Sequence, residues 1–358
     1  MSTLRSSTAR ARLVATLTDE ILQREEASAF PIASEHQLCR RFNLSRVTVR
    51  LALSDLENRG LIYRKHGKGT FANGRSTRVH RYLGVLMKSP QMTAHRSITD
   101  MIRGAQTVMA SLRSAVLLIS TSPEAWRPEK ASSLGGVIVV PHDITTMDLE
   151  VLKDRNLPYT VFTESDLPGP RVDLGQREAA RTMTEKLLQL GHRRIALLTG
   201  FDSCLDAPKL KGVHDALQAA GIDPGQVPEY SAHGRESDIF QAAHDLLKLR
   251  PRPTAVVAFD DSLGSILSFQ ARRQEGMEIP RDLSIVSFHD WPYLNYIEPS
   301  LTTTGFEFLK AGQSAAEALN HAALTGTPVP DITFAPVYRP GQSIGPVPAH
   351  ASSQAPGL

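Results

Sequence analysis

Residues 34–72 read SEHQLCRRFNLSRVTVRLALSDLENRGLIYRKHGKGTFA, and the pattern of this stretch decides the fold of the N-terminal part of the chain. Ser34 is followed three residues later by Gln37, which is the spacing of a capping box at the start of a helix. Leu38 and Phe42 lie four residues apart and would share the buried side of that helix. We therefore expect a short amphipathic helix to begin after Ser34.

A second helix is expected after a short turn, because the Ser45 hydroxyl is suited to accept a hydrogen bond from the first turn of a helix. Arg46 and Arg50 lie four residues apart, one turn above the other, beside the apolar stripe of this helix. The stripe recurs at three- and four-residue spacing and consists of Val49, Ala52, Leu53 and Leu56. The sequence Asn58-Arg59-Gly60 is expected to end the helix.

Residues 61–71 then read as a tight hairpin whose tip is the basic, Gly-rich sequence His66-Gly67-Lys68-Gly69. Two helices joined by a short turn, the second with Ser and Arg at its N-terminus, match the way in which a recognition helix enters the major groove of DNA. Arginine binds guanine bidentately there, and the hairpin tip would contact phosphates or the neighbouring minor groove. The alternative is an amphipathic helix pair with solvated arginines, but it does not explain why the caps, the basic turn and the Gly-rich tip occur together in this order.

Residues 34–72 resemble the winged helix-turn-helix of GntR-type bacterial regulators over roughly the whole of that domain. The residues that carry the resemblance are Ser34-Glu35, Leu38, Phe42, Ser45-Arg46, Thr48-Val49-Arg50, Ala52-Leu53, Leu56, Gly60-Leu61-Ile62 and Gly67-x-Gly69-Thr70-Phe71. The resemblance implies DNA contacts by His36, Ser45, Arg46, Thr48, Arg50, His66 and Gly67, and the basic tip adds Lys68. The chain departs from the family at two places, because His36 replaces the usual arginine and Ile32-Ala33 replaces the usual Leu-Pro.

The formal charge of the 358-residue chain, +3, is unevenly distributed. Residues 1–81 carry 15 Lys and Arg against 7 Asp and Glu, a net of +8, whereas the remainder carries 25 against 30, a net of −5. A basic N-terminal part on an acidic body favours a polyanion partner at one end only. Cys39 and Cys204 are the only cysteines, and no apolar run approaches the ~20 residues of a membrane span, so we expect a cytoplasmic protein with no membrane partner.

Ala9 to Arg24 is amphipathic and is expected to be the first helix of a winged domain over residues 1–72, followed by a polar linker over 73–81. From Tyr82 onward, short Val-, Ile- and Leu-rich runs alternate with helical segments, which is typical of an α/β fold with parallel sheets covered on both faces. The expected strands are 83–87, 115–119, 136–140, 159–162, 195–199, 255–259 and 284–288. The expected helices lie around 97–111, 146–155, 175–190, 208–220, 237–249 and 261–275.

Four phrases in this region resemble the ligand-binding domain of LacI/GalR regulators, which is related to periplasmic sugar-binding proteins. They are residues 190–196 (LGHRRIA), 253–261 (PTAVVAFDD), 279–286 (IPRDLSIV) and 299–303 (PSLTT). The resemblance implies an effector-binding domain over 82–345 with two doubly wound, Rossmann-like lobes and a small molecule in the cleft. It implies a first lobe of about 82–165 and 305–325 and a second lobe of about 166–303 and 326–345. The chain is expected to cross between the lobes near Ser165, Thr304 and Gly326. The segment 120–134 is expected to be shorter than the helix that the family has there. The Pro-, Ala- and Ser-rich residues 346–358 are expected to be a disordered tail.

The same resemblance aligns a set of residues with cleft positions, namely Ser89, Met92, Glu164, Lys209, Asp260, His289, Phe306 and Phe308. Carboxylates accept hydrogen bonds from sugar hydroxyls, lysine donates to them, and aromatic rings stack on the apolar face of a sugar. Other roles stay open: Asp260 could cap a helix, Phe306 or Phe308 could belong to the core, and His289 could be structural. Trp291 is either a stacking platform or a packing residue. Lys209 replaces a bidentate arginine of the family, and this change disfavours a standard hexose.

Catalytic signatures such as HExxH, the P-loop and a CxxC zinc pattern are absent from the sequence, so we expect neither an enzyme nor a cofactor or metal. The combined reading is a bacterial transcription regulator, a repressor, that binds a near-palindromic operator as a homodimer and responds to a carbohydrate-like effector. The alternative is a regulator with a non-sugar effector or a degenerate, ligand-independent sensor. A secreted solute-binding protein and a fusion to a pyridoxal-phosphate aminotransferase fit less well, because the first needs a secretory signal and about 265 residues are short for the second.

Overall fold

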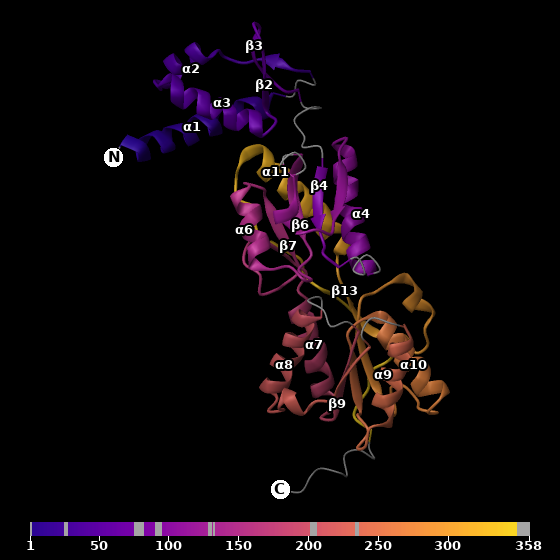
Figure 1. The fold of residues 1–358 in the computed structure, drawn as a ribbon. Helices are drawn as coiled ribbons and strands as arrows, with labels where there is room; N and C mark the ends of the chain where they lie inside the picture. The colour runs from indigo at the N-terminus through magenta and orange to yellow at the C-terminus, as the bar shows by residue number, and fades with distance from the viewer. Residues whose placement is uncertain are drawn as a thin grey trace. The chain divides into compact units, whose positions relative to one another are not determined.

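The computed structural model describes residues 2–24, 28–74, 82–89, 95–127, 131, 133–200, 206–232 and 236–348 (Figure 1). The chain divides into two compact units. Unit 1 comprises residues 1–162, 167–172 and 308–332 and holds the N-terminal domain with one α/β lobe, and unit 2 comprises 163–166, 173–307 and 333–358 and holds the other lobe. The crossing expected near Gly326 falls at 332–333, because residues up to Ile332 still join the unit 1 sheet.

Three helices and a small antiparallel sheet form the N-terminal domain, called the winged domain below. Its helices are α1 (Ser2–Gln23), α2 (Glu35–Phe42) and α3 (Arg46–Asn58), and its sheet has the order β1 (Phe30–Pro31), β3 (Gly69–Ala72), β2 (Ile62–Lys65). The predicted apolar stripe of α3 is confirmed, because its four residues are fully buried. They share the core with residues of α1, α2 and the loop to β2, namely Leu13, Leu17, Ile21, Leu38 and Leu61.

The local signals that define α2 and α3 are confirmed. Ser34 and Gln37 form the predicted capping box, in which Gln37 N donates to Ser34 Oγ (3.3 Å) and Ser34 N donates to Gln37 Oε1 (2.8 Å). Asn43 ends α2 in the left-handed conformation (φ +52°), and Ser45 Oγ then caps α3 by accepting from Thr48 N (3.2 Å). The two caps therefore fix the short turn between the helices.

The expected linker begins later than residue 73. Asn73 N donates to Leu61 O (2.8 Å) and Asn73 Nδ2 donates to Gly60 O (2.6 Å), so Asn73 closes the winged domain. Residues 75–81 lie outside the described residues.

The lobe of unit 1 is an α/β layer structure. Its sheet has the order β14 (Ile332–Thr333), β8 (Arg171–Asp173), β7 (Tyr159–Phe162), β6 (Leu134–Val139), β4 (Tyr82–Leu86), β5 (Ala115–Ile119). The pairs from β8 to β5 are parallel. The helices are α4 (Arg96–Ser111), α6 (Thr146–Asp154) and α11 (Phe308–Thr325), with a 3₁₀ turn, η3 (Pro123–Ala125), in the segment expected to be short.

Unit 2 repeats this plan. Its sheet has the order β10 (Glu229–Ser231), β9 (Ile195–Thr199), β11 (Ala255–Ala258), β12 (Ser284–Phe288), β13 (Thr302–Gly305), β15 (Val337–Arg339), of which β15 alone is antiparallel among these described strands. The helices are α7 (Gln176–Gln189), α8 (Ala207–Ala219), α9 (Glu236–Lys248) and α10 (Asp261–Arg273), with the 3₁₀ turns η4 (Pro224–Gln226) and η5 (Pro292–Tyr296). The expected α/β class with two parallel, doubly wound lobes is confirmed.

The tail expected to be disordered from residue 346 is partly built into unit 2, which corrects that expectation. Val347 N donates to Leu190 O (3.0 Å), and the Val347 side chain lies over Gly191. Residues 349–358 lie outside the described residues.

One long helix, α11, was not predicted from the sequence, although it lies beside α4 in the lobe of unit 1 (Figure 1). Its inner face consists mostly of small residues, namely Ala311, Gly312, Ala315, Ala316 and Ala323. Small residues allow two helix backbones to approach closely, and a Cβ on Gly312 would lie 1.9 Å from Met101 O of α4. A Cβ on Gly104 would likewise lie 2.0 Å from Leu309 O, so each glycine admits the backbone of the other helix.

The α7–α8 pair in unit 2 uses the same device. A Cβ on Gly212 of α8 would lie 2.0 Å from Arg177 O of α7. Each unit therefore depends on a helix crossing at which a side chain cannot be accommodated.

We predict that Gly312→Ala lowers the free energy of unfolding. Overpacking a core typically costs roughly 1–3 kcal/mol, and the loss here should reach at least that range because the added methyl group meets backbone and not a flexible side chain. Gln106→Ala, on the exposed side of α4, is the matched control and is expected to change the unfolding free energy by no more than about 0.5 kcal/mol. Urea denaturation of both variants measures the effect, and equal stability of Gly312→Ala and wild type would show that the crossing is looser than described.

Candidate functional site

The outward side of α3 carries the residues expected to contact DNA. Arg46 and Arg50 are largely exposed, with 74% and 62% of their side-chain surface accessible, and His36 and Ser45 are exposed beside them. Thr48 is different, because only 8% of it is accessible and its Oγ1 lies 2.8 Å from Ser45 Oγ. The structure therefore places Thr48 under the cap of α3 and away from the exposed surface.

Glu35, at the start of α2, faces both arginines. Its Oε2 lies 3.2 Å from Arg50 Nε and 3.7 Å from Arg46 Nε. Exposed ion pairs of this kind contribute little to stability, but one carboxylate shared by two guanidinium groups restrains the direction of both. Sequence reasoning missed this role. The sequence shows only that Glu35 follows Ser34, the capping serine of α2.

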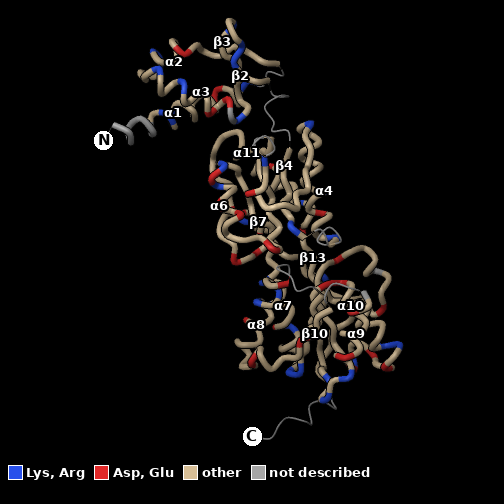
Figure 2. The backbone as a smooth tube through the Cα atoms, in the orientation of Figure 1, with Lys and Arg blue, Asp and Glu red and all other residues tan. Residues whose placement is uncertain are grey.

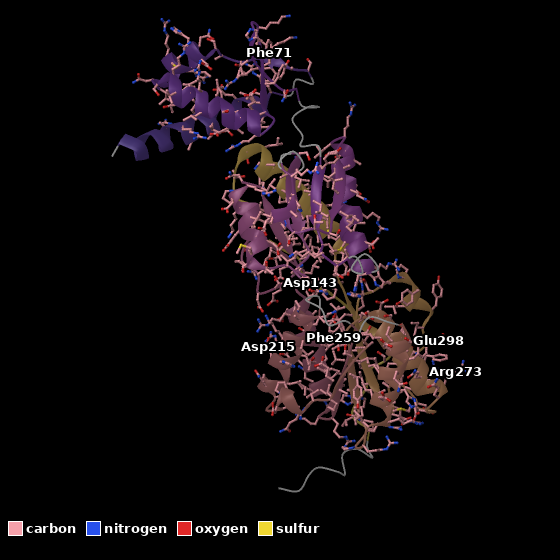
Figure 3. The ribbon with its side chains drawn as sticks, in the orientation of Figure 1. Phe71, Asp143, Asp215, Phe259, Arg273 and Glu298 are labelled. Atoms are coloured by element: carbon pink, nitrogen blue, oxygen red, sulfur yellow. The ribbon has the colours of Figure 1, made fainter. Side chains whose placement is uncertain are left out.

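The β2–β3 hairpin forms the wing. Its tip turns through two glycines with positive φ, Gly67 (+70°) and Gly69 (+107°), so His66, Gly67 and Lys68 all lie exposed. Tyr63 stacks on Phe71 with ring centroids 5.6 Å apart and stiffens the stem, and Figure 3 labels Phe71. Figure 2 shows Lys and Arg positions, coloured blue, along α2 and along this hairpin. The winged domain thus presents the predicted basic residues of α3 and the wing at its surface.

The strand ends of unit 1 carry a polar cluster around Asp148. Asp148 accepts hydrogen bonds from Lys88 Nζ (2.7 Å), Ser122 Oγ (3.0 Å) and Thr145 N (2.8 Å), which follow β4, β5 and β6 respectively. Burial disfavours its charged form, but the hydrogen bonds from Lys88, Thr145 and Ser122 outweigh burial and lower the pKa of Asp148. One carboxylate therefore ties together three loops at the edge where a ligand of a parallel sheet would bind. Ser89 lies next to this cluster, and Met92 lies outside the described residues.

Lys209, expected to contact an effector, is buried in unit 2 with 2% of its surface accessible. Its Nζ donates to Phe259 O (2.7 Å) and lies 2.8 Å from Asp206 Oδ1. The rings of Phe259 and Phe288 lie 5.6 and 5.7 Å from the ammonium group, and Figure 3 places Phe259 in the interior of unit 2. The charge of Lys209 is thus satisfied inside the protein by Asp206 and Phe259 O, and a contact between Lys209 and an effector stays a prediction.

Asp260, Glu164 and Phe308 each have a partner within their own unit. Asp260 is the N-cap of α10, with Oδ1 accepting from Leu263 N (2.9 Å), as the alternative reading proposed. Glu164 lies 3.7 Å from Arg177 Nη1. Phe308 is buried against Phe162 in unit 1, whereas Phe306 belongs to unit 2, so the two phenylalanines do not share one site in either unit.

His289 stands in a cluster of aromatic and acidic groups after β12. Its ring lies 5.9 Å from Trp291 and 5.8 Å from Phe306, and its Nδ1 lies 3.4 Å from Asp261 Oδ1. Tyr293 donates its hydroxyl hydrogen bond to the other oxygen of Asp261. The backbone of His289 is left-handed (φ +74°), an uncommon conformation that Thr303 and Thr304 hold through hydrogen bonds to its main chain. Asp261 and Tyr293 were not among the effector contacts expected from the sequence.

The expectation that catalytic signatures are absent overlooked one motif, because residues 341–345 read GQSIG and so have the GxSxG form found around the nucleophile of some hydrolases. Ser343 is fully buried, and its Oγ both donates to Ile285 O and accepts from Thr302 N (2.8 Å), so it is a structural link between strands. Among the described residues there is no group of three His, Cys, Asp or Glu side chains placed to bind a metal ion. The described helices include none with the length and apolar character needed to cross a membrane.

Two family models match the chain. The model for bacterial regulatory proteins of the gntR family matches residues 9–72, and the model for the periplasmic binding protein-like domain matches residues 184–344. Both resemblances drawn from the sequence are thereby confirmed.

Known proteins are similar to this chain in sequence or in fold. The chain is 28% identical over 306 residues to an arabinose metabolism transcriptional repressor of Geobacillus stearothermophilus, which covers 80% of this chain and 84% of that protein. A LacI family transcriptional regulator of Enterococcus faecium with bound ribose superposes with a TM-score of 0.64 at 21% identity, over 74% of this chain and 99% of that one. A complex of the transcriptional regulator CelR with cellobiose superposes with a TM-score of 0.63 at 20% identity, over 86% of this chain and 94% of that one.

We predict that Asp148→Asn lowers the unfolding free energy at pH 7 by roughly 1–3 kcal/mol, because a buried charge-assisted network loses its charge. The pKa of Asp148 is lower in the folded state than in the unfolded state, so its contribution is present above the unfolded pKa of about 4 and is lost as the pH falls through the folded pKa. The stability gap between wild type and variant should therefore narrow on acidification.

Denaturant unfolding at a series of pH values from 7 downward measures this gap. Asp166→Asn is a suitable control, because Asp166 pairs with Lys211 but its side chain is 94% exposed. A gap for Asp148→Asn that stays constant below pH 4 would contradict the assignment.

Proposed function

We propose that this chain, which joins a gntR-family DNA-binding domain to a periplasmic binding protein-like domain, is a bacterial transcriptional repressor controlled by a small carbohydrate-like effector. The observation that carries the proposal is the basic surface of the winged domain. Arg46 and Arg50 project from a capped helix, Glu35 restrains them, and the exposed wing tip supplies His66 and Lys68. The match to regulatory proteins along both parts of the chain supports regulation over catalysis.

DNA recognition follows from the chemistry of these groups. Guanidinium groups on a recognition helix bind the O6 and N7 atoms of guanine, while Ser45 and the wing tip bind phosphates. A homodimer would present two such helices to the half-sites of a near-palindromic operator, which is how two-fold symmetric regulators reach the required affinity.

A route for communication lies within unit 1. Arg59, the C-cap of α3, donates from Nη1 to Thr325 O (2.8 Å) at the end of α11, and Leu324 packs against the core of the winged domain. The other end of α11 begins at Phe308, which contacts Phe162 at the end of β7. A shift of α11 on effector binding would therefore act on the C-terminus of the recognition helix. Regulation requires that the effector bind one state of the chain more tightly than the other.

The cluster around His289 supports a carbohydrate-like effector. Trp291 and the ring of His289 are partly exposed and lie 5.9 Å apart, and the indole offers an aromatic face that suits the apolar face of a sugar. The relatives named for arabinose metabolism and the neighbours holding ribose and cellobiose agree with this class. The internal pairing of Lys209 favours the second candidate, a non-sugar effector or a ligand-independent sensor, because it removes one hydrogen-bond donor from the site.

The DNA-binding proposal predicts that Arg46→Ala and Arg50→Ala each weaken specific operator binding by roughly 1–3 kcal/mol while binding to unrelated DNA changes less. Arg103→Ala is a matched control, because Arg103 of α4 has the same side-chain exposure as Arg50, 62%. Fluorescence anisotropy with full-length chain measures the affinities, and unchanged operator affinity in both recognition-helix variants would remove the assignment of α3.

The effector proposal predicts a thermal shift of the full-length chain in a panel of mono- and disaccharides, sugar phosphates and polyols. Tight binding to the folded state alone adds ~2.7 kcal/mol at a hundredfold excess over the dissociation constant. Trp291→Ala should reduce the shift, whereas Tyr296→Ala, whose side chain is 88% exposed, should retain it. No shift with any compound would favour the second candidate.

A further inference from the structure

The centre of the outward face of α3 is apolar. At 100° per residue, the four buried residues of the α3 stripe point in one mean direction, and Val47 points within about 10° of the opposite direction. Val47 is 69% exposed, and Leu51, one turn later on the same face, is 46% exposed. Arg46 and Arg50 both lie on one side of Val47 and Leu51 lies on the other, so the arginines border the apolar centre along one side.

The exposed apolar residues at the centre of this basic surface indicate that the DNA presents an apolar group to them. Isolated exposed hydrophobic residues are ordinary on protein surfaces, but these two are neighbours at i and i+4 on the face that the winged domain turns to DNA under the proposed function. Val47 is the second residue of α3, and the N-terminal residues of a recognition helix are the ones that contact base edges in the major groove. A valine there forms no hydrogen bonds, so its partner on the base must be apolar.

Among the four bases, the major groove offers one apolar group, the C5-methyl group of thymine. We propose that Val47 contacts a thymine methyl group in each operator half-site, with Leu51 covering the side of that contact away from the arginines. The operator should then carry a thymine beside the guanine that Arg46 or Arg50 binds. This inference rests on the proposed function and adds a residue that determines sequence specificity.

The test uses full-length chain and an operator selected from a random duplex DNA library. Each thymine of the half-site is replaced in turn by uracil, which removes only the methyl group. At one position, wild type should bind about fourfold more weakly, which corresponds to ~0.8 kcal/mol for one buried carbon. Val47→Ala should bind the thymine and uracil operators equally at that position, because the partner of the methyl group is gone.

Two further variants isolate the contact. Val47→Thr keeps one methyl group on the same Cβ and should retain part of the uracil effect. Met147→Ala removes another exposed hydrophobic side chain (62%) of unit 1, on α6, and should keep the full effect.

The outcomes separate the inference from the function on which it rests. Specific operator binding that Arg46→Ala weakens, with no thymine sensitive to uracil, would overturn the role of Val47 and leave the proposed function intact. The role of Val47 would also be overturned if replacing thymine by uracil weakened operator binding of Val47→Ala as much as that of wild type. Failure of the library to yield any specific duplex would overturn the proposed function and this inference together.

Discussion

The backbone contact between α4 and α11 is the constraint on which unit 1 depends. Gly104 and Gly312 bring the two helices so close that no side chain fits between them. Because α11 comes from residues 308–325, the chain passes through residues 173–307 of unit 2 before it returns to supply this helix to the lobe of unit 1. The same helix contacts Phe162 at one end and Arg59, the C-cap of α3, at the other, so its position fixes both a strand end and the end of α3.

Local signals account for what the sequence predicted well. The caps at Ser34 and Ser45 and the alternation of apolar runs with helical segments each depend on residues close together in the chain, so the winged domain and the main strands could be located. α11 was missed because its inner face is alanine and glycine, and such a face packs by close approach of backbones and gives only a weak apolar periodicity. Short strands such as β8, β10 and β15 have three residues each and carry too little pattern.

The candidate sites also differ in whether they depend on residues close in sequence or distant in sequence. The exposed arginines of α3 follow from helix geometry alone, whereas the environment of a charged residue in the lobes depends on partners distant in sequence. Lys209 is neutralised by the nearby Asp206 but is enclosed by Phe259 and Phe288, and the Asp148 cluster gathers residues from three loops. A residue type at an aligned position therefore indicated chemistry without indicating whether the group faces solvent or core.

The placement of Glu35 beside Arg46 and Arg50 has a consequence for how the chain would search a chromosome. Attraction to phosphates governs binding to unrelated DNA, and a carboxylate next to two guanidinium groups lowers the positive potential that any phosphate meets. Guanine gives directed hydrogen bonds that compensate for this repulsion, whereas backbone alone does not. Under the proposed function, the carboxylate would thus shorten the time spent at each wrong site and would let a small number of molecules scan more sequence in the same interval.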